Sequence, residues 1–197
     1  MRFLVVYCHP NEESFCAALR TAAVSALEEA GHDVDLIDLY AEGFDPVLSA
    51  EERATYNTNP EANVASVEEH VAAIDRCDAL AFIYPTWFHG PPAMLKGWLE
   101  RTWLPGRCFE IPSGKGKAAR SKMRRIRRLV VVTTSGAPSW WLWLIGDPGR
   151  KLFARGLRLL FAWNCRTTWL QLYSINNTTH DDRQRFLNRV SAKLRGI

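Results

Sequence analysis

The sequence predicts an α/β domain built on a five-stranded parallel sheet in the order 2-1-3-4-5. Short continuous apolar runs, typical of strands buried on both faces, alternate along the chain with segments whose apolar residues recur every three or four positions, as in helices. The composition fits one ordinary core, because 47% of the 197 residues are hydrophobic and 23% are charged. We therefore expect residues 1–197 to form a single domain.

The first half of the chain supplies two of these strands. Residues 3–7 are a buried-strand run, and Ser14 suits the N-cap of a helix that ends at Gly31. Residues 34–39 predict the second strand. Residues 41–63, rich in Pro, Asn, Gly and charge, predict a long surface connection.

The rest of the chain repeats the alternation of strands and helices, which favours parallel strands joined by helical crossovers. Pro85 is expected to end the third strand. These predicted elements are helices over 67–76, 93–103 and 181–194 and strands over 79–84, 129–133 and 167–173.

Three loops follow strands one, three and four, and open sheets of this order bind ligands there, where the strand order reverses. The loop over 9–15 leads into a helix whose free N–H groups, with the Ser14 hydroxyl, favour a phosphate. It lacks Gly-x-Gly-x-x-Gly, the fingerprint of a tightly bound dinucleotide. A capped helix with nothing bound is the alternative interpretation.

The loop over 85–90 gathers Trp87, Phe88 and His89 at a strand end, and Gly90 allows close approach of backbone to a ligand. This pattern favours a flat heteroaromatic ligand. An aromatic plug over the sheet edge is the alternative.

Several classes of protein and site are excluded by the composition. No apolar run reaches the length of about 18 residues that a membrane-spanning helix needs, and the N-terminal stretch lacks signal-peptide features, so we expect a cytoplasmic protein. Widely spaced cysteines predict reduced thiols, neither a disulfide framework nor a metal site. They are Cys8, Cys16, Cys77, Cys108 and Cys165.

The net charge of +4 is local, because 8 of the 25 Lys and Arg residues lie between Lys115 and Arg128. A solvated loop is favoured there over a site for the extra phosphate of NADPH, for anionic lipid or for nucleic acid, and the lack of interleaved aromatic residues argues against a nucleic-acid partner. The aromatic segment over 139–145 favours packing against a partner protein over a peripheral membrane contact.

Motifs along the whole chain resemble the flavin-dependent NAD(P)H:quinone oxidoreductases, the DT-diaphorase family, whose fold is a flavodoxin-like three-layer sandwich. The most specific motif is Pro-Ala-x-Leu-Lys-Gly-Trp at 92–98. The others are His9-Pro10, Ser14-Phe15, Asp38 to Ala41, Phe44 to Pro46, Pro85 to Pro91, Leu99 to Arg101, Thr133 to Gly136, Tyr173 to Ile175 and Asp182-Arg183.

The resemblance implies a flavin site formed by the three loops, with FAD favoured over FMN because Arg183 falls where FAD-binding members contact the adenosine half. An ordinary surface charge is the competing interpretation of Arg183. Residues implied at the phosphate are His9, Ser14, Phe15 and Cys16; those along the isoalloxazine are Pro85, Thr86, Trp87, Phe88 and His89; those at its pyrimidine edge are Thr133, Thr134, Ser135 and Gly136.

The catalytic residues implied are less conventional. Animal members carry a Tyr and then a His after the Thr-Thr-x-Gly loop, whereas here Trp141 takes the Tyr position and no His occurs between Ala137 and Asn164. His89 is the candidate substitute. Amides near Gly136 would stabilise negative charge on the flavin, and Trp141 with Phe109 would wall the acceptor pocket.

The expected activity is ping-pong transfer of a hydride from NAD(P)H through FAD to a quinone or another flat acceptor, by a homodimer. Reduction of azo or nitro compounds is an alternative activity. A second alternative is a regulatory flavoprotein on a potassium-efflux transporter, docked through the aromatic segment, and a third is a scaffold that has lost its flavin.

Overall fold

The computed structural model describes residues 1–112 and 114–197. Its main sheet has the order β2-β1-β3-β6-β7 with every neighbouring pair parallel, which confirms the predicted order 2-1-3-4-5. The strands are β1 (Arg2–Tyr7), β2 (Asp33–Asp38), β3 (Ala79–Thr86), β6 (Arg128–Ser135) and β7 (Arg166–Leu172).

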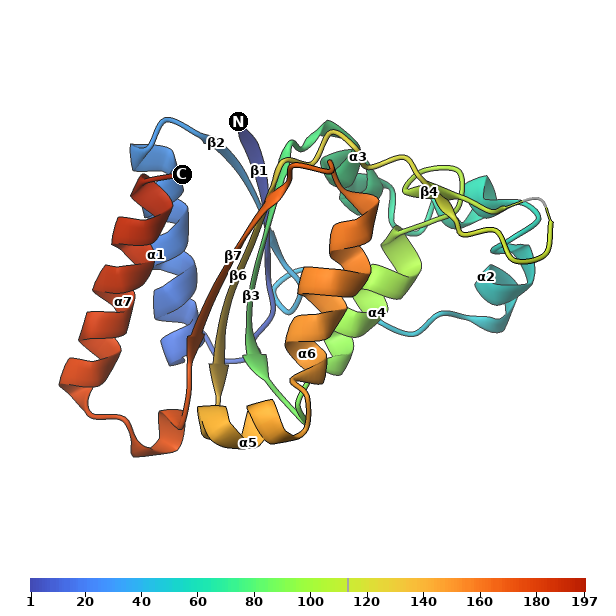
Figure 1. Cartoon of the computed structure of the whole chain (residues 1–197). Helices are drawn as coiled ribbons and strands as arrows, with labels where there is room; N and C mark the ends of the chain where they lie inside the picture. The colour runs from blue at the N-terminus through green and yellow to red at the C-terminus, as the bar shows by residue number, and fades with distance from the viewer. Residues whose placement is uncertain (113) are drawn as a thin grey trace.

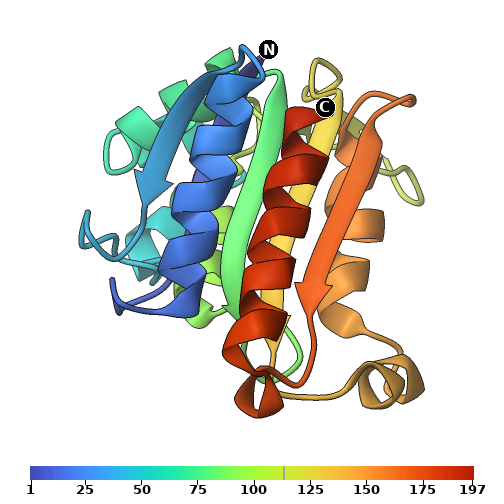
Figure 2. The same cartoon turned by 90° about the vertical axis from the view of Figure 1, so that its left-hand side faces the viewer.

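Helices cover both faces of this sheet and give three layers (Figure 1). Two of them, α1 (Phe15–Glu29) and α7 (His180–Arg195), run side by side across one face (Figure 2). The opposite face carries α3 (Glu68–Arg76), α4 (Ala93–Thr102) and α6 (Pro148–Lys151). The predicted α/β three-layer sandwich is therefore confirmed.

Two local predictions are wrong. Residues 41–63 are not a plain connection, because they contain α2 (Ala50–Thr55), fixed by a capping box between Ser49 and Glu52, and the 3-10 turn η1 (Pro60–Asn63). Pro85 does not end β3, which continues to Thr86. The carbonyl of Ile83 faces β1, so the missing N–H of Pro85 points to the same side, beyond the last residue of β3 that pairs with β1.

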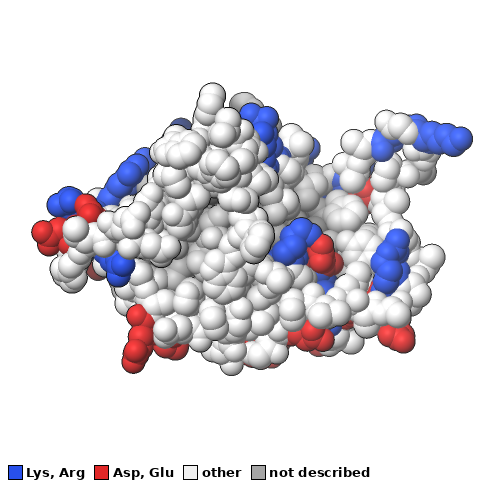
Figure 3. Space-filling model, turned by 90° about the horizontal axis from the view of Figure 1, so that it is seen from below, with Lys and Arg blue, Asp and Glu red and all other residues white. Residues whose placement is uncertain are grey.

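Short elements complete the chain, and one of them lies across the lower edge of the sheet in Figure 1, namely α5 (Ser139–Leu144). The others are β4 (Phe109–Glu110), β5 (Arg120–Ser121), the π turn η2 (Leu152–Gly156) and the 3-10 turns η3 (Leu157–Leu160) and η4 (Ile175–Asn177). The parallel strands end at this lower edge. Figure 3 shows that its middle is largely uncharged, with Lys, Arg, Asp and Glu mostly toward the margin.

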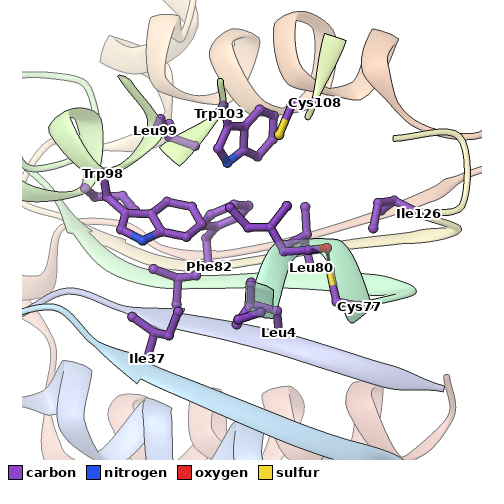
Figure 4. Close-up of a cluster of buried hydrophobic side chains, with 14 of the residues drawn as sticks. Leu4, Ile37, Cys77, Leu80, Phe82, Trp98, Leu99, Trp103, Cys108 and Ile126 are labelled. Atoms are coloured by element: carbon purple, nitrogen blue, oxygen red, sulfur yellow. Dashed lines mark hydrogen bonds between the residues drawn. The ribbon is translucent and has the colours of Figure 1, made fainter. Parts of the chain in front are cut away.

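The larger of two buried clusters lies between the sheet and α3 and α4 (Figure 4). Trp98 is fully buried, with its ring 6.2 Å from that of Phe82, and its Nε1 donates to Nδ1 of His70 at 3.2 Å. The buried indole N–H therefore has a hydrogen-bond partner.

The specific motif around Gly97 owes its residues to packing. A Cβ on Gly97 would lie 2.2 Å from the carbonyl oxygen of Pro46, so only glycine allows this close approach. One turn later the buried Arg101 donates to the carbonyl of Asp45 and to Glu52, both at 2.5 Å. These contacts fasten the long connection to α4.

The basic run over 115–128 does structural work in its second half, where a solvated loop was predicted. Arg124 donates to the carbonyl of Phe161 at 2.8 Å, Arg125 donates to that of Ile74 at 2.5 Å and Lys122 donates to that of Gly106 at 2.6 Å. Three cations of the run therefore form hydrogen bonds with backbone carbonyls of the fold.

Candidate functional site

The first site loop joins β1 to α1. Ser14 caps the helix, since its Oγ accepts the amide hydrogen of Ala17 at 3.1 Å, which leaves the Ser14 hydroxyl hydrogen for a ligand. The ring nitrogen Nδ1 of His9 lies 3.0 Å from the amide nitrogen and 3.1 Å from the carbonyl oxygen of Asn11. Because that nitrogen is held by the loop, Nε2 is the one left to meet a ligand beside the positive end of α1.

Glu12 and Glu13 lie just before the N-terminus of α1, and Glu12 forms an ion pair with Arg20. Arg20 pairs with Glu12 at 2.8 Å and with Asp38 at 2.8 Å. Its guanidinium lies 4.7 Å from the ring centroid of Tyr7, below the loop. The negative charge of Glu12 is therefore drawn toward Arg20, which lowers the repulsion that an anion at the α1 N-terminus would meet.

A second cation reaches the same end of α1 from α7. The guanidinium of Arg183 lies 6.0 Å from the ring centroid of Phe15, and its Nε donates to Oγ1 of Thr178 at 3.0 Å. This side chain is half-buried and held in place, unlike a freely solvated surface arginine. The structure thus places Arg183, expected at the adenosine half of FAD, beside Phe15 of the expected phosphate region.

The second site loop is a two-residue turn at the end of β3. Trp87 and Gly90 exchange backbone hydrogen bonds of 3.0 Å in both directions, and the two residues between them have positive φ: 46° at Phe88 and 64° at His89. Non-glycine residues in this region carry a strain of roughly 1–2 kcal/mol each. The turn leaves the Phe88 ring completely exposed at the lower edge of the sheet, which suits stacking on a flat ligand.

Contacts between the loops hold them at one edge. The rings of His9 and Trp87 lie 6.1 Å apart, which joins the first loop to the second. The hydroxyl oxygens of Thr86 and Thr133 lie 3.0 Å apart and join the second loop to the third. The amide of Ser174 donates to the carbonyl of Ala137 at 3.2 Å and adds the loop after β7. The three predicted loops therefore form one constellation.

The third loop exposes backbone rather than side chains. The Oγ of Ser135 accepts the amide hydrogen of Ala137 at 3.1 Å and closes a tight turn around Gly136. Gly136 is exposed, and a Cβ built on it would find only Nδ2 of Asn176, at 3.5 Å. A ligand can therefore approach this backbone closely.

Burial separates the predicted residues into two groups. Those with reachable groups are His9, Ser14, Phe15, Thr86, Trp87, Phe88, His89, Gly136 and Arg183; those buried beneath them are Cys16, Pro85, Thr133, Thr134 and Ser135. The buried side chains support the loops from below. Cys16 is 3% exposed, and burial raises the pKa of its thiol to about 12, so its side chain is a neutral packing group.

The predicted acceptor pocket walled by Trp141 and Phe109 does not form within the chain. Trp141 belongs to α5 at the lower edge, whereas Phe109 lies in β4, far from α5 (Figure 1). The reason is that β4 follows α4, which has returned the chain toward the amino ends of the strands.

A cavity that sequence reasoning missed lies beside α5 instead. Its volume is about 790 Å³ and it is bounded by α5, α6 and Tyr173. The signal in the sequence was a pair of tryptophans, Trp140 and Trp143, followed by Arg150 and Arg155, which the local helical turns bring to one groove.

The remaining sequence features concern metals, thiols and membranes. All five cysteines are buried and unpaired. Across residues 1–112 and 114–197, no cluster of three or more His, Cys, Asp or Glu has the arrangement of a metal site. Over the same residues, no helix combines the length and hydropathy that crossing a bilayer requires.

A family model described as a flavodoxin-like fold matches residues 1–195, and the chain belongs to that family. The crystal structure of Smu.1420 from Streptococcus mutans UA159 is 30% identical and superposes with a TM-score of 0.86, with both chains covered completely.

Several relatives of the chain are named as quinone oxidoreductases or quinone dehydrogenases. The structure of an NAD(P)H:quinone oxidoreductase from Methanothermobacter marburgensis is 28% identical, with a TM-score of 0.80 over 99% of this chain and 96% of that one. The ribosyldihydronicotinamide dehydrogenase [quinone] of Pongo abelii is 31% identical over 126 residues, or 56% of this chain. The match covers 54% of that relative's length, little more than half. The resemblance to quinone oxidoreductases is confirmed.

Proposed function

We propose that the chain is a single-domain flavin-dependent NAD(P)H dehydrogenase that reduces quinones or similar flat acceptors, with FAD as its cofactor. The observation that carries the proposal is the convergence of an anion-binding helix end, an exposed aromatic turn and an exposed glycine backbone on one edge. Likeness to the quinone oxidoreductase from Methanothermobacter marburgensis supports the reaction class.

The residues present fit a flavin. The N-terminus of α1 and the Ser14 hydroxyl suit its phosphate group, and the Arg183 guanidinium beside Phe15 suits the adenosine half that FAD adds. The fully exposed ring of Phe88 suits its isoalloxazine face. Gly136 lies where a side chain would occupy open space beside the loop. Flavin, when bound, supplies hydride acceptance from NAD(P)H and two-electron delivery to the acceptor.

The chain would position this chemistry and tune its charge. Backbone amides around Gly136 would donate to the developing negative charge, a type of contact that contributes about 3–4 kcal/mol per donor elsewhere. The strained turn at Phe88 and His89 would hold the ring plane, because its two ends are hydrogen-bonded to each other. His89 is the candidate proton carrier and Trp141 the candidate wall of the acceptor site.

The chain would act as a homodimer in the cytoplasm, and the exposed aromatic helix supports a partner surface. Trp141 and Leu144 of α5 and Ile145, the residue that follows it, are each at least 38% exposed. A peripheral membrane contact through α5 and docking on a potassium-efflux transporter are the competing occupants.

The test is the visible spectrum of protein reconstituted with FAD and, separately, FMN, followed by anaerobic NADPH and then a quinone. We expect FAD to be retained, bleached by NADPH and reoxidised by the quinone without any membrane fraction. An azo dye in place of the quinone measures the breadth of acceptors. Retention of neither flavin would overturn the proposal, and retention without bleaching would favour a regulatory flavoprotein.

A further inference from the structure

The cavity beside α5 combines aromatic rings with cations. Trp140 and Trp143 line it with exposed rings, 63% and 80% accessible. Arg150, Lys151 and Arg155 line it as well, from α6 and the turn that follows. Stacking surfaces and cations in one groove are what an anionic heteroaromatic molecule needs.

The charge in the groove is not balanced internally. Among the described residues, the one carboxylate that lines the groove is that of Asp147, whose Oδ1 accepts the backbone amide hydrogen of Arg150 at 3.2 Å as the cap of α6. Within residues 1–112 and 114–197, no ion pair engages Arg150, Lys151 or Arg155. Three cations against one carboxylate leave an excess of positive charge for a ligand.

The groove adjoins the loops of the candidate flavin site. The amide of Gly149, in α6, donates to the carbonyl of His89 at 3.0 Å. Tyr173 of the groove precedes Ser174, which is hydrogen-bonded to the third loop. A molecule lying across the aromatic turn can therefore extend into the groove without crossing the protein.

The other basic region of the chain is a poor competitor for such a ligand. Lys122, Arg124 and Arg125 of the basic run already donate to backbone carbonyls. The run also precedes β6, and so leads into the amino ends of the strands, opposite the candidate site. A phosphate carried by a ligand of this site would meet the groove first.

We propose that the groove binds the adenosine end of NADPH, with Trp140 and Trp143 against the adenine and with Lys151 and Arg155 on the ribose 2′-phosphate. This inference rests on the proposed function, and it adds that NADPH is the preferred reductant. NADH lacks the 2′-phosphate, so these cations make the protein select NADPH. A cavity of about 790 Å³ is within the range of small-ligand sites.

Binding of adenosine 2′,5′-bisphosphate and of 5′-AMP, measured by calorimetry on the purified protein, tests the groove without flavin chemistry. We expect the bisphosphate to bind about ten-fold more tightly, because charge-assisted contacts to the 2′-phosphate are lost in 5′-AMP. The double variant Lys151→Ala/Arg155→Ala removes this difference. Both side chains are exposed, so the variant keeps its fold.

Two further variants sharpen the result. Trp143→Ala weakens both nucleotides by a similar factor, as expected for a stacking surface, and Lys193→Ala, which removes an exposed cation of α7, changes neither. In turnover, the ratio of kcat/KM for NADPH to that for NADH falls about ten-fold in the double variant.

Equal affinity for the two nucleotides in the wild type, or bisphosphate binding unchanged by the double variant, overturns the inference. If the protein discriminates between the two nucleotides but NADPH does not bleach its flavin, the proposed function is refuted and the nucleotide-binding role of the groove stands. If NADPH and NADH bleach the flavin with equal efficiency, only the role of the groove is refuted.

Discussion

The amide of Gly149 donates to the carbonyl of His89 at 3.0 Å, and a Cβ on Gly149 would lie 2.9 Å from that same oxygen. Through this contact the start of α6 packs against the strained aromatic turn and helps to hold its two positive-φ residues. The turn and the groove beside α5 are therefore in direct contact.

Gly149→Ala is expected to weaken flavin binding about ten-fold while the protein stays folded, because the added methyl group must displace the turn. The measurement is the flavin dissociation constant from quenching of flavin fluorescence. Gly156→Ala is the matched control, since its Cβ would meet nothing closer than 3.9 Å. Equal loss in both variants would argue against a specific role for the contact.

Gly136→Val is expected to abolish flavin loading with little change in the thermal midpoint. The backbone here has open space on the ligand side, with Asn176 Nδ2 at 3.5 Å as the nearest group, so the side chain fills room that the cofactor needs. Absorbance of the reconstituted protein and circular dichroism measure the two properties. A fully loaded variant would remove Gly136 from the site.

Arg183→Gln is expected to weaken the binding of FAD about ten-fold and the binding of FMN by a smaller factor. The reason is that the guanidinium serves the second phosphate and the adenosine half, which only FAD carries. Calorimetry with each flavin gives both constants. Arg189→Gln, at an exposed position six residues further along α7, is the control. An equal effect on both flavins would assign Arg183 to the phosphate they share.

His89→Asn tests the imidazole without disturbing the turn, because asparagine tolerates the positive φ of 64° at this position. We expect turnover to fall, because the amide of asparagine cannot accept and release a proton as an imidazole does. The measurement is steady-state turnover of the variant and the unchanged protein at several pH values. Unchanged turnover at every pH would exclude a proton-carrying role for His89.

Alkaline pH is expected to destabilise the fold. Burial raises the pKa of Cys8, Cys16, Cys77 and Cys108 from 9.0 to about 12. The folded state therefore holds protons that the unfolded chain releases, so this stability is fully present below pH 9 and is lost as the pH rises toward 12.

Chemical denaturation between pH 8 and 11 measures that loss. Cys8→Ala removes one such group and makes the decline shallower by about 1.4 kcal/mol per pH unit. A free energy of unfolding that stays flat across this range would show that the thiols ionise normally.

The sequence by itself determined the sheet order, four of the helices that cover the sheet (α1, α3, α4 and α7) and the three loops of the candidate site. Those features follow from local signals: buried-strand runs, a serine cap before α1 and the aromatic cluster after β3. Because the carboxyl ends of parallel strands must lie at one edge, topology alone brought His9, Trp87 and Gly136 together.

Only the tertiary structure decided what each side chain does there. Whether Thr133 meets a ligand or a neighbour depends on Thr86, which is 47 positions away in the chain. The glycine of the 92–98 motif is explained by Pro46, and the cations of the basic run by carbonyls on other elements. Such long-range contacts leave no local pattern, so the groove beside α5 became visible only when its turns were folded against Tyr173.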